Sequence, residues 1–250
     1  MVKVITVPGS SAMDEMRRLL AQRAITGLHP TLFGKREAAD AIASDFSQAT
    51  DLKKVRRVIA KSQKYDLPRE FARFFEPDEL DETELEERRA EEEWVMGESG
   101  ESAAEKNQED AGEDEEAVLY TCMDGEELLE TTYIGLWQIA EPWQAFAYLG
   151  LGEDSDQIIG GVKHCALHRH WQERWGAEVV ALQENMVECF VARPPLTRAD
   201  ALILAREQYF YCGALVHQGA GSVVELAEIL FGRKRWYFWW GGFRLLAHKF

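Results

Sequence analysis

Three side chains with the chemistry of covalent catalysis lie near one another in the last quarter of the sequence. Cys212 and His217 are five residues apart, and Glu207 precedes them. A thiol beside an imidazole that a carboxylate orients is the arrangement of an activated nucleophile. The structural alternative is a buried cysteine near a helix end, since a thiol must also be acidic enough to react. The three residues are therefore catalytic candidates only if their side chains meet in space.

Two histidines have the spacing of a metal site. His164 and His168 are four residues apart in a segment predicted to be helical, so both imidazoles point to one face. Zinc accepts such ligands, but the sequence has no HExxH motif, no CxxC pair and no identifiable third ligand. We therefore favour a helix whose histidines partly face solvent. We expect no metal and no cofactor, because no glycine-rich phosphate loop is present either.

Five consecutive aromatic residues, Trp236 to Trp240, are the most distinctive stretch of the chain. Because successive side chains of a strand point to opposite faces, the run predicts a strand that is covered on both sides, in the middle of a sheet. The alternative is an aromatic wall of a ligand or partner pocket. In that case Trp236, Trp239 and Trp240 are the binding residues.

Charged residues accompany these segments. Arg174, Glu178 and Arg206 either form ion pairs that hold helices on the sheet or line a polar cleft beside the aromatic strand. Charges close to a buried sheet need partners or ligands. The three are therefore further candidates for a binding site.

The net charge of −16 comes from one segment. Residues 76–116 hold 20 acidic and 3 basic residues, which leaves 24 acidic and 25 basic residues elsewhere. This contrast predicts a small α/β lobe at 1–75, an acidic helix and flexible linker at 76–117, and an α+β domain at 118–250. A basic helix at 53–64 is typical of a solvated outer face and, alternatively, of nucleic-acid binding.

Local patterns predict the elements that position the candidate residues. Strands are expected at 2–7, 29–33, 117–122, 131–139, 177–182 and 186–191, and the first two are expected to pair in parallel through a crossover helix. A helix is expected to end at Gly176, and Thr197 and Ser222 are expected to cap two further helices that lead into the aromatic strand.

Several of these segments resemble a known family. The run His170 to Glu178, the segments 193–197 and 204–209, the pair Gln218-Gly219 and the aromatic run follow one another in the order of the bacterial domain of unknown function 4253. The resemblance covers residues 136–240 and extends less specifically to the N-terminal part. It implies no activity. Two carboxylate positions of that family, after Cys212 and after the aromatic run, are occupied here by Gly213-Ala214 and Gly241.

Taken together, the sequence predicts an α+β protein with a mixed or antiparallel C-terminal sheet, flanking helices, a central aromatic strand and a small N-terminal α/β lobe. Our preferred hypothesis is a non-catalytic bacterial protein that binds another protein, with an immunity protein against a basic toxin as its specific form. The alternatives are a hydrolase or transferase with a cleft near Glu207, Cys212 and His217, and nucleic-acid binding through residues 53–64. Scattered cysteines and the lack of long apolar runs or a signal peptide favour the cytoplasm.

Overall fold

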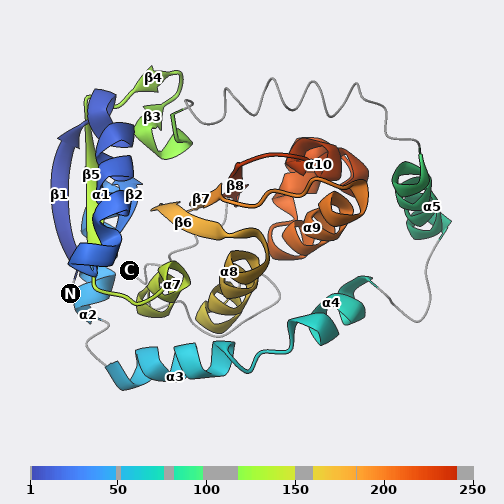
Figure 1. Cartoon of the computed structure of the whole chain (residues 1–250), viewed down its shortest axis with the longest axis horizontal. Coiled ribbons are helices and arrows are strands. Elements are labelled where there is room, and N and C mark those ends of the chain that lie inside the picture. Colours follow the sequence, from blue (N-terminus) through green and yellow to red (C-terminus); the bar gives the residue numbers. More distant parts are fainter. Residues whose placement is uncertain are drawn as a thin grey trace.

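The fold is built on one six-stranded sheet. The computed structural model describes residues 2–48, 52–75, 82–97, 118–149, 160–183 and 185–240 of the chain. The strands lie in the order β1-β5-β2-β6-β7-β8 (Figure 1). Neighbouring strands are antiparallel except β2 and β6, which are parallel. This mixed sheet with flanking helices confirms the predicted α+β class. The strands are β1 Val2–Pro8, β2 His29–Gly34, β3 Met123–Asp124, β4 Glu127–Leu128, β5 Thr131–Trp137, β6 Ala177–Leu182, β7 Met186–Val191 and β8 Arg235–Trp239.

Helices cover both faces of the sheet, and β3 and β4 form a separate small hairpin (Figure 1). The helices are α1 Ala12–Thr26, α2 Arg36–Gln48, α3 Leu52–Ser62, α4 Leu67–Phe75, α5 Glu82–Met96, α7 Ala145–Tyr148, α8 Gly161–Trp175, α9 Arg198–Tyr211 and α10 Val223–Leu230. Four short turns join them, the 3-10 segments Gly9–Ser11, Tyr120–Cys122 and Pro142–Gln144 and the π-helix Leu215–Ala220. Within the described residues, no helix is both long and apolar enough to cross a membrane.

Alternation along the strands divides the core into two clusters. In β2, Phe33 faces the larger cluster under α2, α3 and α7 to α10, while Leu32 faces the smaller one under α1. Trp137 and Leu136 divide in the same way in β5. Because side chains of a strand alternate between faces, one sheet supports both clusters at once.

The predicted helix boundaries in the C-terminal half are confirmed. Gly176 ends α8 with a left-handed φ of 65°, the conformation that glycine adopts without a Cβ penalty. The hydroxyl of Thr197 accepts a hydrogen bond from Asp200 N at 3.1 Å, and the hydroxyl of Ser222 accepts one from Glu225 N at 3.1 Å. These caps satisfy amide donors at the starts of α9 and α10.

The N-terminal strands do not form a parallel pair. β5 lies between β1 and β2 and is antiparallel to both, so the two N-terminal strands belong to the same sheet as β6, β7 and β8. The predicted strand at 117–122 is also wrong, because Tyr120–Cys122 is a 3-10 turn. The predicted flexible linker, apart from Gly97, lies outside the described residues.

The aromatic strand is not central. β8 pairs with β7 on one side and is the last strand of the described sheet. Trp236 and Phe238 face the core, whereas Tyr237 is half-buried and Trp239 is 36% exposed. Five aromatic residues in a row therefore do not require cover on both faces, because large apolar side chains also occur at the surface of folded proteins.

Gly135 provides a test of the packing between β5 and β2. A Cβ atom at this position would lie 2.3 Å from the ring of Phe33, which is fully buried. We expect Gly135→Ala to lower the free energy of unfolding by about 1–3 kcal/mol, measured by urea denaturation, because the core has no room for the methyl group. In the double variant with Phe33→Leu, the loss should be smaller than the sum of the single losses. Additive losses would contradict the predicted contact.

Candidate functional site

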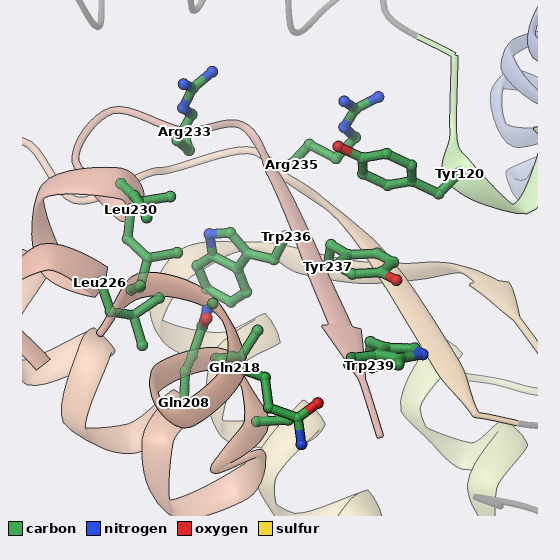
Figure 2. Close-up of a pocket in the computed structure, with 15 residues that line it drawn as sticks. Tyr120, Gln208, Gln218, Leu226, Leu230, Arg233, Arg235, Trp236, Tyr237 and Trp239 are labelled. Atoms are coloured by element: carbon green, nitrogen blue, oxygen red, sulfur yellow. The ribbon is translucent and has the colours of Figure 1, made fainter. Parts of the chain in front are cut away.

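A pocket of about 460 Å³ opens where β8, the π-helix and α10 meet (Figure 2). The inward side chain of Trp236 and the outward side chains of Tyr237 and Trp239 all line it. Residues of both strand faces reach one pocket because β8 lies at the edge of the sheet. The opposite wall is apolar and comes from Leu226 and Leu230 of α10, together with Leu215 of the π-helix. A volume of this size falls in the range of about 300–1,000 Å³ that is usual for ligand pockets.

Two buried hydrogen-bond donors line this pocket. Gln208 and Trp236 are each 1% exposed. Neither Gln208 Nε2 nor Trp236 Nε1 has a hydrogen-bond partner among the described residues. Figure 2 shows the Gln208 amide beside the Trp236 ring, with both directed to the same side of β8. A buried donor without a partner costs about 1–3 kcal/mol, so a ligand acceptor that reached either nitrogen would be favoured here.

Two arginines give the pocket its charge. Arg233 and Arg235 lie along one rim of the pocket (Figure 2). Arg235 donates to Val118 O at 3.0 Å, and its guanidinium lies 5.8 Å from the centre of the Tyr120 ring. None of the described residues that line the pocket is acidic. The two arginines are therefore the only charged residues in the described lining, although the whole chain carries a net charge of −16.

A buried carboxylate holds the Tyr120 wall in place. Glu188, fully buried in β7, accepts hydrogen bonds from Tyr120 N at 3.0 Å, Thr121 N at 2.9 Å and Thr121 Oγ1 at 2.6 Å. Burial raises the pKa of Glu188 in spite of these bonds. The bonds set Tyr120 against Tyr237, with ring centres 4.8 Å apart. Glu188 is thus a positioning residue for the pocket.

The core behind β8 is an aromatic cluster around one hydroxyl group. Tyr211 Oη lies 2.9 Å from His164 Nδ1 and 2.9 Å from His168 Nε2. Both imidazoles stack on Phe146, and Trp171 stacks on Phe238 with ring centres 5.3 Å apart. His164 and His168 therefore share one helix face as predicted, but they are buried and do not face solvent.

The contacts of the two histidines with Tyr211 are made within the protein. Both histidines direct a ring nitrogen at Tyr211, and the described residues contain no group of three or more His, Cys, Asp or Glu side chains suited to a metal ion. Desolvation lowers the pKa of His168 well below its usual range, with a smaller contribution from His164. A neutral His168 suits a structural role, because the Tyr211 hydroxyl can donate its proton to one ring and accept the N–H of the other.

The three catalytic candidates have separate partners. Glu207 accepts hydrogen bonds from Trp171 Nε1 at 2.8 Å and His170 Nε2 at 3.0 Å. Cys212 is buried, donates to Trp239 O at 3.1 Å, and has a pKa that burial raises to about 11. His217 is exposed and lies 3.2 Å from the Tyr209 hydroxyl. The predicted cysteine–histidine–carboxylate arrangement is not formed by these contacts.

The charged binding candidates form ion pairs. Arg174 lies 3.2 Å from Asp200 and 3.6 Å from Glu207, which ties α8 to α9. Arg206 pairs with Glu91 and so ties α9 to α5. These contacts are ion pairs between helices, the first of the two roles that the sequence suggested. Neither arginine lines the pocket.

Glu178 belongs to another part of the sheet. It pairs with Arg23 of α1, and its carboxylate lies 3.3 Å from Nδ1 of the buried His29. That contact lacks hydrogen-bond geometry, whereas His29 Nε2 donates to Val179 O at 3.0 Å. Desolvation dominates and lowers the pKa of His29 to about 4. Glu178 thus anchors α1 beside β6 and does not line the pocket.

The aromatic candidates divide between pocket and core. Trp236 and Trp239 line the pocket, whereas Trp240 packs near Tyr211, with ring centres 5.2 Å apart. Sequence reasoning missed the remaining pocket residues. Gln208 and Gln218 lie in the segments that carry the family resemblance, so those segments contained a usable signal; Tyr120 is brought in from outside them.

The comparison with protein families confirms the resemblance. Residues 133–241 match the family described as a domain of unknown function (DUF4253). The N-terminal strands lie outside the matched range, so their weaker resemblance stays a prediction. No curated protein and no solved structure matches the chain.

Glu188 can be tested by a substitution that keeps its shape. Glu188→Gln replaces one acceptor oxygen with a donor that faces Tyr120 N or Thr121 N. We expect a loss of about 1–3 kcal/mol in unfolding free energy and faster hydrogen exchange at both amides. Glu127→Gln, an exposed residue of the neighbouring hairpin, is the control. Unchanged exchange at residues 120 and 121 would show that Glu188 does not hold this wall.

His29 predicts a specific loss of stability in acid. Its folded pKa of about 4 lies below the usual value of 6.5, so protonation favours the unfolded chain. This contribution is complete above pH 6.5 and is lost as the pH falls towards 4. The part of it lost by pH 5 is about 2 kcal/mol. Urea unfolding at pH 7.5 and pH 5 should therefore show a smaller acid loss for His29→Gln than for the wild type. An equal loss in both proteins would contradict the buried, neutral histidine.

Proposed function

We propose that the protein works by binding another protein, and that the partner inserts a side chain into the pocket beside β8. The observation that carries this proposal is the grouping of Trp236, Tyr237 and Trp239 with Arg233 and Arg235 on one concave surface. Tryptophan, tyrosine and arginine are the residues that most often dominate the binding energy of protein interfaces. A pocket at a sheet edge also gives a partner segment direct access.

Exposed apolar groups beside the pocket support this role. Ile229 of α10 lines the pocket and is 50% exposed, and Trp239 is 36% exposed. Large apolar side chains grouped at the surface mark sites of interaction more often than single ones do. On this proposal, Trp239 and Ile229 become buried when the partner binds.

The finer versions of the proposal concern setting and partner. An immunity protein that neutralises a toxin in the cytoplasm remains one form of it, and the partner would then be the toxin. The enzyme hypothesis has less support, since Glu207, Cys212 and His217 have separate partners. The basic residues of α3 form an exposed face, and Val55 on the other side of the helix is buried. A solvent-facing helix of this kind does not by itself favour nucleic-acid binding.

A matched pair of isoleucine variants tests the binding surface. The tagged full-length protein would be purified from its native cells as wild type, as Ile229→Arg and as Ile25→Arg. Ile25 is an exposed helical residue of α1, 89% accessible, and does not line the pocket. We expect a stoichiometric partner with the wild type and the Ile25 variant, and at least about tenfold less with Ile229→Arg, because a hot-spot disruption of about 2 kcal/mol exceeds a tenfold affinity change.

Two results would contradict the proposal. One is a wild-type preparation without any stoichiometric partner. The other is equal partner recovery with Ile229→Arg and Ile25→Arg, which would place the interface elsewhere. Circular dichroism of both variants would establish that each is folded before recovery is compared.

A further inference from the structure

The chemistry of the pocket specifies what it binds. Resting on the proposed function, we propose that the pocket selects a partner segment that presents a carboxylate beside an aromatic or apolar side chain. Three independent properties of the pocket lead to this class, namely its hydrogen-bond donors, its charge and its aromatic wall.

The donors require acceptor atoms on the ligand. An indole nitrogen is only a donor, and the unpartnered atom of Gln208 is an amide nitrogen. Both atoms are buried and belong to side chains that line the pocket. A carboxylate offers two oxygens with about four acceptor sites, so it can accept from either donor. An ammonium group has no acceptor and would leave both donors without partners.

The charges favour an anion over a neutral acceptor. Arg233 and Arg235 contribute the only formal charges among the described lining residues. Hydrogen bonds to an ionised group are about twice as strong as neutral ones. Glu188 lies behind the Tyr120 wall and interacts with Arg235, but burial raises the pKa of Glu188, so the two arginines are the charged groups that line the pocket itself.

The aromatic wall selects what accompanies the carboxylate. The rings of Trp236, Tyr237 and Trp239 and the side chains of Leu226 and Leu230 offer apolar surface next to the donors. A single carboxylate is far smaller than 460 Å³, so the pocket also accommodates a neighbouring side chain. An aromatic ring fits this surface because edge-to-face and offset-stacked contacts add to its burial energy.

The net charge of the protein restricts the partner further. A chain with a net charge of −16 repels a strongly acidic partner at long range. The pocket therefore suits a short acidic element on a partner that is otherwise neutral or basic. Composition alone led us to expect a basic partner. The pocket adds that the segment of this partner that enters it is acidic.

Three capped peptides of one length test the selectivity. The probes are Ac-Ala-Phe-Glu-Ala-NH₂ and its analogues with Gln or Lys in place of Glu, titrated into the full-length ¹⁵N-labelled protein. The readout is the indole N–H resonance of Trp236, assigned from the spectrum of Trp236→Phe. We expect this resonance to shift downfield with the Glu peptide, which should bind at least about tenfold more tightly than the Gln peptide. The Lys peptide should not saturate the pocket.

Charge variants identify the groups that recognise the carboxylate. Arg233→Gln and Arg235→Gln should each weaken binding of the Glu peptide several-fold and leave the Gln peptide unchanged. Arg17→Gln, which removes an exposed arginine of α1, is the matched control and should change neither affinity. The other indole resonances report whether each variant keeps its fold.

The results separate this inference from the proposed function. Equal affinity for the Glu and Gln peptides, or no binding of either, overturns the carboxylate preference, as does an equal effect of the Arg17 control. Recovery of the native partner does not depend on these peptides, so its loss with Ile229→Arg would still support protein binding. Binding of free 3-phenylpropionate as tight as that of the Glu peptide would also overturn the inference, because the pocket would then recognise a small acid without a peptide.

Discussion

The hydroxyl group of Tyr211 is the contact on which the C-terminal half depends. It lies in an aromatic core where an unsatisfied polar atom is costly, and it joins His164 and His168 of α8 to the end of α9. The hydroxyl has one proton to donate, so one imidazole accepts that proton and the other donates its own N–H to the hydroxyl oxygen. The rings of Phe146, Trp171 and Phe238 pack around this arrangement and fix β8 on the helices. Trp236 is placed in the pocket wall as a consequence.

Continuity of the sheet sets the size of the structural unit. β5 pairs with β1 and β2, and the sheet continues from β2 to β6 in parallel. The family match begins at residue 133, within β5, and therefore includes a strand whose two neighbours lie outside the matched range. The N-terminal strands complete the sheet of the matched region, and the parallel pairing expected for them is replaced by antiparallel pairing with β5.

Local signals predicted much of the fold. The caps at Thr197 and Ser222, the glycine at 176 and the strands at 177–182 and 186–191 depend on neighbouring residues, and they were predicted correctly. Strand order depends on contacts between distant segments, so the edge position of β8 could not be inferred from aromatic content. A strand with apolar residues on both faces has the same sequence pattern whether helices or a binding partner cover its outer face.

The pocket was only partly predictable for the same reason. Trp236 and Trp239 were identified because large aromatic residues stand out in a sequence. Glu188 and Tyr120 meet only after folding, since β7 and the 3-10 turn are far apart in the chain. Arg174 and Arg206 pair with acidic neighbours and so serve the scaffold, whereas the polar motif residues that line the pocket are the uncharged Gln208 and Gln218.

The position of β5 between β1 and β2 has a consequence for how the protein is made. β1 and β2 leave the ribosome long before Thr131 of β5 is synthesised. During that time the strand that pairs with both of them is missing. Unpaired strand edges invite association with other chains, and distant pairings form slowly. The nascent chain is therefore prone to association with other chains until β5 emerges and pairs with β1 and β2. Chaperone binding would have its largest effect in this interval.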